Sequence, residues 1–216
     1  MANWVVISSL ATAGGTLVLA GATFASVRSA NRSARVAEET LLAGMRPLLM
    51  PSRPDDPAIK VGFSDDHFVQ VHGSSGTAEA TDSVIYLTMS IRNAASGIAV
   101  LHGWRVEMPR DIATLANADC PEISSFRRLT RDLYIAAGDI SFWQGAYRNP
   151  GESEFSQMRE HVRSRERFFV DLLYGDHRGG QRVVSRYSFQ PRESAGAEDW
   201  YVTVVRHWNV DQPDPR

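Results

Sequence analysis

The chain has 216 residues, a formal net charge of −2 and a single cysteine, Cys120. This charge balance gives no indication of nucleic-acid binding, and one cysteine excludes an intrachain disulfide framework and a multi-cysteine zinc site. The roughly 170 residues after position 46 are enough for one globular domain with a core of its own.

Residues 4–27 contain no charged side chain, and the run stops at Arg28. As a helix it would be about 36 Å long, enough to cross a hydrocarbon core of about 30 Å. Residues 1–27 are therefore predicted to form a transmembrane helix. The alternative is a cleaved signal peptide with Thr23-Phe24-Ala25 as the cleavage site, in which case the soluble domain would be exported.

Positive charge flanks this run on one side only. Arg28, Arg32 and Arg35 follow it, and no lysine or arginine precedes it. The positive-inside rule makes these three the topology determinants, with the N-terminus outside and the soluble domain in the cytoplasm. We expect a single-pass protein of a bacterial inner (plasma) membrane, with the lipid bilayer as its first partner. Residues 28–46 are predicted to form a juxtamembrane helix and linker.

Small and hydroxyl side chains fall on one face of the predicted span, at Ser8, Thr12, Thr16 and Ala20. Such spacing lets two helices approach closely in lipid, so this face is a candidate interface for a homo-oligomer or a partner helix. The alternative is that the hydroxyls bond to carbonyls of their own helix.

From position 47 the apolar pattern changes to the alternation that is typical of strands. A loop is expected at residues 73–76, a long connection at 109–132 with at most one helical turn, and one helix from Ser153 that buries Phe155, Met158 and Val162. The expected strands cover residues 48–50, 59–63, 68–71, 84–91, 98–108, 133–136, 140–147, 168–174, 181–189 and 200–210.

Many short strands around one inserted helix favour a mainly β fold after the N-terminal helix. We predict an antiparallel β-sandwich of immunoglobulin-like architecture over residues 47–210, and a disordered tail over residues 211–216. On one face of the strand at 98–108 we place Ile98, Val100, His102, Trp104 and Val106, which makes His102 a core residue or a residue at a strand bend.

Two stretches carry a resemblance: LTMSIRNAASGIA at residues 87–99 and YGDHRGG at residues 174–180. Together with the span and the basic helix they resemble bacterial single-pass membrane-anchored β-sandwich proteins of uncharacterised function. The resemblance implies the fold and no activity.

The sequence contains no phosphate-binding glycine loop, zinc-protease helix or nucleophile elbow, and we expect no catalytic site, cofactor or metal. His67 and His72 would point to opposite faces of a strand, which is poor geometry for a metal. Two arginine groups are weighed as surfaces that attract anionic lipid, although interleaved glutamates favour a solvated, salt-bridged face. The groups are Arg127, Arg128 and Arg131, and Arg159, Arg163 and Arg167.

Three hypotheses for function follow. The first is a non-enzymatic, membrane-anchored protein whose β-sandwich binds a partner protein or a ligand at the membrane surface. The second is a membrane-tethered hydrolase, which requires two of His67, His102, His177 and His207 to converge with a carboxylate. The third is an accessory subunit held by its transmembrane helix.

Overall fold

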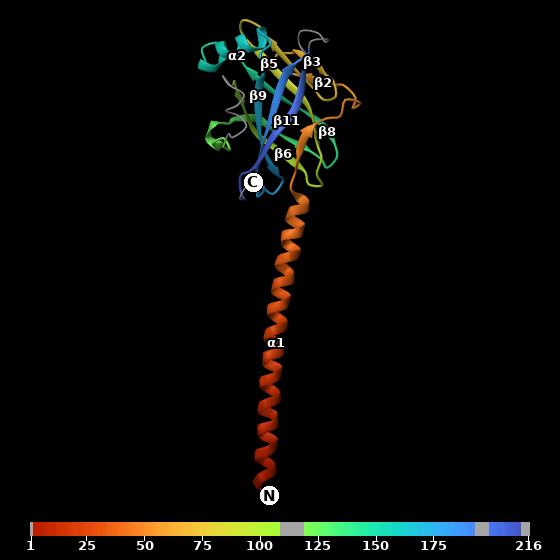
Figure 1. Cartoon of the computed structure of the whole chain (residues 1–216), viewed down its shortest axis with the longest axis vertical. Coiled ribbons are helices and arrows are strands. Elements are labelled where there is room, and N and C mark those ends of the chain that lie inside the picture. The colour runs from red at the N-terminus through yellow and green to blue at the C-terminus, as the bar shows by residue number, and fades with distance from the viewer. Residues whose placement is uncertain (1, 109–118, 193–198, 213–216) are drawn as a thin grey trace. The chain divides into compact units, whose positions relative to one another are not determined.

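The computed structural model describes residues 2–108, 119–192 and 199–212 (Figure 1). The chain forms two compact units, Met1–Gly44 and Met45–Arg216. The first unit is almost entirely helical, and the second contains the described strands.

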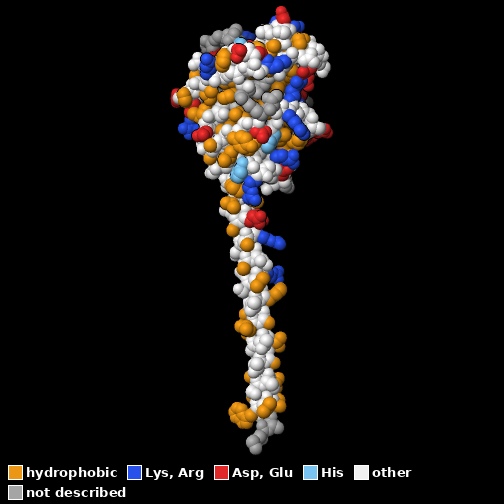
Figure 2. Space-filling model, turned by 180° about the vertical axis from the view of Figure 1, so that it is seen from behind, with side chains coloured by type: hydrophobic (Ala, Val, Ile, Leu, Met, Phe, Trp, Pro, Cys, Tyr) orange, Lys and Arg blue, Asp and Glu red, His pale blue; other side chains and the backbone are white. Residues whose placement is uncertain are grey.

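The first unit consists of α1 (Ala2–Met45), one helix of 44 residues. At 1.5 Å per residue it is about 66 Å long, so the helix continues well beyond the uncharged run. Figure 2 shows hydrophobic side chains along the helix up to the first basic ones. The prediction of one N-terminal helix long and apolar enough to cross a membrane is confirmed by length and composition.

The second unit is built mainly from strands in antiparallel pairs, with a short 3-10 helix, η2 (Ile123–Ser125), and one α-helix, α2 (Ser153–Arg163). The strands are β1 (Leu49–Pro51), β2 (Ile59–Gly62), β3 (Phe68–Val71), β4 (Ser75–Ala80), β5 (Ile85–Asn93), β6 (Ala99–Glu107), β7 (Arg127–Ile135), β8 (Ile140–Tyr147), β9 (Phe168–Asp176), β10 (Val183–Pro191) and β11 (Asp199–Asn209).

Nine of these strands form one sheet in the order β1-β5-β4-β11-β10-β9-β6-β7, with β8 on the other edge of β5. Strands β6 and β8 are far apart in this order, yet Trp104 of β6 packs against Trp143 and Tyr147 of β8. The sheet therefore curls around a shared core. The predicted antiparallel β domain is confirmed, whereas an immunoglobulin-like sandwich of two packed sheets is not.

The second sheet is the two-stranded pair β2–β3, which packs on the outer face of β5 and β8. Its Val61 and Val69 share a small core with Tyr86 and Phe142. The helix α2 lies at one end of the domain (Figure 1) and buries the three apolar residues expected of it in the main core. Both elements cover apolar surface that the curled sheet leaves open.

Two segments predicted as loops are strands. The expected loop at 73–76 leads into β4, where Ser75 and Gly76 are buried. Ser75 pairs with β11, and Gly76 pairs with both β5 and β11. The expected connection at 109–132 contains η2 and most of β7, so Arg127 and Arg128 lie on a strand. The part of that connection at 109–118 lies outside the described residues.

A β-bulge at His102 changes which residues of β6 face the core. The pairing of β6 with both neighbours shifts between Leu101 and Gly103. As a result Ala99, Leu101, Trp104 and Val106 belong to the main core. A bulge reverses the alternation of a strand. The predicted core face is therefore correct for Trp104 and Val106, after the bulge. Before the bulge the core residues are Ala99 and Leu101 instead of the predicted Ile98 and Val100.

Most of the predicted tail at 211–216 falls outside the described residues. Asp211, at its start, accepts hydrogen bonds from the backbone and guanidinium of Arg182. The contacts of the domain therefore extend one residue beyond the predicted boundary.

Candidate functional site

The two outermost strands of the curled sheet do not pair with each other. Among the described residues, β7 pairs with β6 alone, and β8 pairs within the sheet with β5 alone. Residues of both strands line a cavity of about 480 Å³ that separates their unpaired edges. The lining comprises Gly62, Phe63, Ser64, Trp104, Arg127, Arg128, Leu129, Gln144, Gly145, Ala146 and Arg148.

Trp104, a member of a buried aromatic cluster, contributes to the wall of the cavity. Trp104 is 5 % exposed, and its ring meets Trp143 and Tyr147 edge-on at centroid distances of 5.4 Å. A Cβ atom added to Gly145 would lie 3.0 Å from the Trp104 ring. Glycine at this position of β8 therefore allows the indole to reach the cavity, and the packed neighbours hold the indole in place.

Arg127 crosses one end of the gap between the strands. Its guanidinium lies 4.4 Å from the centre of the Tyr147 ring and donates hydrogen bonds to Glu152 (2.6 Å) and Glu154 (3.1 Å). Burial, reinforced by the charge of Glu154, raises the pKa of Tyr147 well above its usual range, so this phenol stays neutral. Because the phenol carries no charge, it is the two glutamates that compensate the charge of Arg127.

Arg148 is compensated in a similar way by Asp65. The Tyr86 hydroxyl donates a hydrogen bond of 2.6 Å to Asp65, and Arg148 donates a second one. The Tyr86 hydrogen bond and then that of Arg148 lower the pKa of Asp65 to about 2. This carboxylate is therefore ionised at neutral pH and balances the charge of Arg148.

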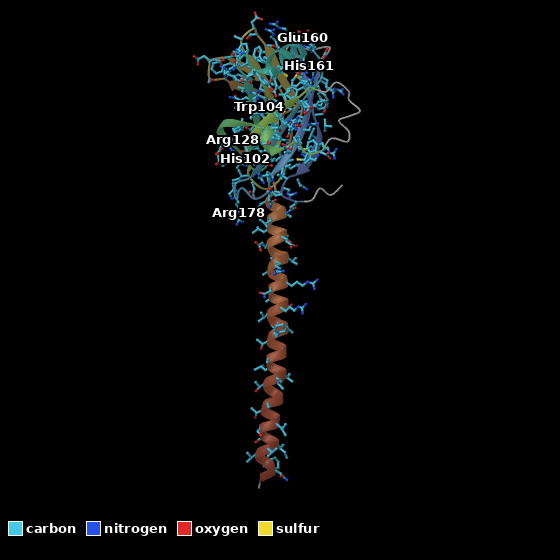
Figure 3. The ribbon with its side chains drawn as sticks, turned by 90° about the vertical axis from the view of Figure 1, so that its left-hand side faces the viewer. His102, Trp104, Arg128, Glu160, His161 and Arg178 are labelled. Atoms are coloured by element: carbon cyan, nitrogen blue, oxygen red, sulfur yellow. The ribbon has the colours of Figure 1, made fainter. Side chains whose placement is uncertain are left out.

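Arg128 differs from its two neighbours in the cavity. It is exposed, and none of the ion pairs formed by the described residues includes it. Figure 3 labels Arg128 and Trp104, which both line the cavity. On the opposite strand, the Oε1 atom of Gln144 is buried and has no hydrogen-bond partner among the described residues. Within the described ranges, Arg128 is thus the one guanidinium of the lining without a carboxylate partner, whereas the Gln144 oxygen is shielded from solvent.

The residues predicted on the span lie on the exposed surface of α1. The Thr12 hydroxyl donates to the Ser8 carbonyl and the Thr16 hydroxyl to the Thr12 carbonyl, each at 2.9 Å. These are the bonds of the alternative interpretation, which leave the face that includes Ala20 able to approach another helix. Helix association stays a prediction.

The three topology determinants share one face of α1. Arg28, Arg32 and Arg35 line the same shallow concavity as Phe24 and Val27. This places the basic side chains directly beside the end of the uncharged run. Their role in orientation stays a prediction.

The histidines named for a hydrolase lie on different elements. The His67 ring is 2.8 Å from Glu79, His102 lies at the β6 bulge, and His177 follows β9 in the turn. None of them, nor His207, lines the cavity. Within the described ranges no group of three or more His, Cys, Asp or Glu residues is arranged to hold a metal ion.

A serine–histidine pair is present that sequence reasoning missed. The Ser185 hydroxyl lies 2.6 Å from Nδ1 of His207 and 2.7 Å from the Tyr174 hydroxyl. Ser185 is fully buried, so no substrate can reach its oxygen from solvent. The pair joins β10 to β11 within the domain. The alternation of β10 indicates that Ser185 is buried, because it falls on the same face as Val183 and Tyr187.

The second arginine group forms a salt-bridged surface. Arg163 lies 2.8 Å and Arg159 3.8 Å from the same oxygen of Asp82. Their charges are therefore shared with an acidic partner, in line with the solvated face that the interleaved glutamates favour.

Comparison with known proteins gave no relatives: no family model, no curated protein and no solved structure matches the chain. The functional argument therefore rests on the residues of the chain.

Proposed function

We propose that this protein is a membrane-anchored binding protein, not an enzyme, and that its β domain takes a ligand in the cavity between β7 and β8. The observation that carries the proposal is the pair of unpaired strand edges that border a cavity with an aromatic wall. Cavities of a few hundred Å³ with a few polar groups are typical of ligand sites.

The chemistry of the lining supports binding over catalysis. In the described part of the chain, its ionisable side chains are the three arginines. Ser64 carries the one hydroxyl group of the lining, and no histidine or carboxylate lies there to activate it.

The binding partner at the membrane surface and the sandwich architecture also remain proposals. The β2–β3 sheet packs over β5 and β8, which gives this part of the domain two β layers. Sheets layered in this way commonly bind through end loops and edges, and Phe63 and Ser64 lie in the loop that leaves β2.

Photocrosslinking from the cavity rim tests the proposed function. In the full-length protein, in its native membrane, Ser64 is replaced by the photoreactive residue p-benzoylphenylalanine. We expect an adduct after illumination, seen as a mass shift of the peptide that contains position 64 or as a larger protein band. The matched control is Ser156, an exposed residue on α2. Equal adduct yields at the two positions would count against a ligand site at the cavity.

We also propose that the β domain lies on the cytoplasmic side, as Arg28, Arg32 and Arg35 indicate. Cys120 is the only cysteine of the chain and is exposed, so it reports the side of the membrane on which the domain lies. We expect a membrane-impermeant maleimide to label Cys120 in sealed inside-out vesicles and to leave it unlabelled in sealed right-side-out vesicles. The opposite pattern would place the domain outside.

A further inference from the structure

We infer that the ligand of the β7–β8 cavity is an organic anion with a compact apolar body, its acidic group bound by Arg128 and its body packed against Trp104. This inference rests on the proposed function and adds the chemical class of the ligand to it.

The charges of the lining favour a ligand with an acidic group. Of the residues that the structure describes, three arginines and no aspartate or glutamate line the cavity. Glu152 and Glu154 hold Arg127, and Asp65 holds Arg148. Arg128 is therefore the one cation of the lining without a carboxylate partner in the described part of the chain. A planar guanidinium binds a carboxylate, sulfonate or phosphate group through paired hydrogen bonds, so an acidic group is the natural partner for it.

The apolar side chains of the lining favour a ligand with an apolar body. Trp104, Phe63, Leu129 and Ala146 line the same cavity as Arg128, and Gly145 has no side chain that would crowd the Trp104 ring there. Burying an apolar body against these groups removes it from water, which favours binding by about 25 cal/mol per Å² of apolar surface. A fully hydrated small anion would use Arg128 and leave this surface unused. A ligand with both parts uses both Arg128 and this apolar surface.

A matched pair of probes separates the two parts of the ligand. The probes are 2-naphthoate and its uncharged analogue 2-naphthamide, which share the apolar body and differ in the acidic group. Each is titrated into the full-length protein in a neutral detergent by isothermal calorimetry, and the heat of titration into empty micelles is subtracted. We expect 2-naphthoate to bind about tenfold more tightly, because a hydrogen bond to a charged group contributes about that factor.

Two arginine variants assign the difference to one side chain. In Arg128→Gln the preference for the anion should disappear, while 2-naphthamide binds as before. Arg178→Gln removes an exposed arginine in the turn after β9, outside the cavity, and should keep the tenfold preference. Both substitutions are at exposed positions, and an unchanged melting temperature of each variant confirms that the fold is intact.

The outcomes distinguish this inference from the proposed function. Equal affinity for the two probes, or a preference that survives in Arg128→Gln, overturns the ligand class and leaves the cavity as a ligand site. Absence of binding by both probes, with specific crosslinking at position 64, overturns the class in the same way. Absence of both binding and crosslinking overturns the proposed function as well.

Discussion

Replacing Asp171 with alanine is expected to lower the free energy of unfolding by about 3–5 kcal/mol, because it leaves a buried guanidinium without its carboxylate. Asp171 of β9 and Arg186 of β10 face each other across the strand pair and are 0 % and 3 % exposed. Two hydrogen bonds of 2.7 Å run from the guanidinium to the two carboxylate oxygens. Chemical unfolding of the full-length protein in detergent, followed by tryptophan fluorescence, measures the change.

An exposed ion pair gives the control for this variant. Arg182 and Asp211 are also joined by paired hydrogen bonds, but both side chains contact solvent. Asp211→Ala should therefore cost at most about 1 kcal/mol. If the two alanine variants lose the same free energy, burial of the Asp171–Arg186 pair does not have the effect we assign to it.

A double variant separates charge from packing. In Asp171→Leu with Arg186→Met both charges are absent, so we expect most of the stability to return. If the double variant is as unstable as Asp171→Ala, the loss does not come from the unpaired charge of Arg186. Arg105, whose Nε lies 3.6 Å from Asp171, loses its carboxylate in both variants. The pair also bears on the cavity, because β9 is the neighbour of β6, the strand that carries Trp104.

The elements that the sequence predicts well are those with a regular apolar period. The uncharged run predicts α1, the spacing of Phe155, Met158 and Val162 predicts α2, and the alternation around residues 168–189 predicts the β9–β10 pair. In each case one local pattern determines the element. No information from distant parts of the chain is needed.

The cavity could not be predicted, because it depends on contacts between distant segments. Strand β7 has no clear alternation, and its pairing with β6 jumps from Leu133 opposite Leu101 to Arg128 opposite Gly103. An irregular strand of this kind looks like a connection in the sequence. That β7 and β8 border one cavity follows from the curl of the whole sheet, which no local pattern encodes. The sequence indicates that Arg128 belongs to a basic group, but not that it lines the same cavity as Trp104.

The short run from Gly73 to Gly76 shows how composition alone can mislead. Two glycines and two serines are typical of flexible loops, yet Ser75 and Gly76 lie in β4 between β5 and β11. Glycine is present at position 76 because neighbouring strands pack closely over it, not because the backbone must bend. A Cβ atom there would lie 2.4 Å from Cε1 of Phe189 and 2.9 Å from the Thr88 carbonyl oxygen.

The contrast between a flexible loop and a packed strand at position 76 leads to a second prediction with a large effect on stability. In a flexible loop Gly76→Val would cost little, whereas in the packed sheet we expect a loss of about 3 kcal/mol, since Phe189 is fully buried and its ring has no space to move into. The β propensity of valine works against that loss, so a large destabilisation would come from overpacking.

Gly180→Val is the matched control, because no atom lies within 4 Å of a Cβ added at Gly180 in the turn before β10. The free energy of unfolding of both variants, measured as for Asp171→Ala, should differ by most of the 3 kcal/mol. Equal stabilities of Gly76→Val and Gly180→Val would indicate that residues 73–76 form the loop that their composition predicts. A large difference would support the packed position of Gly76 in β4, and with it the curled sheet that forms the cavity.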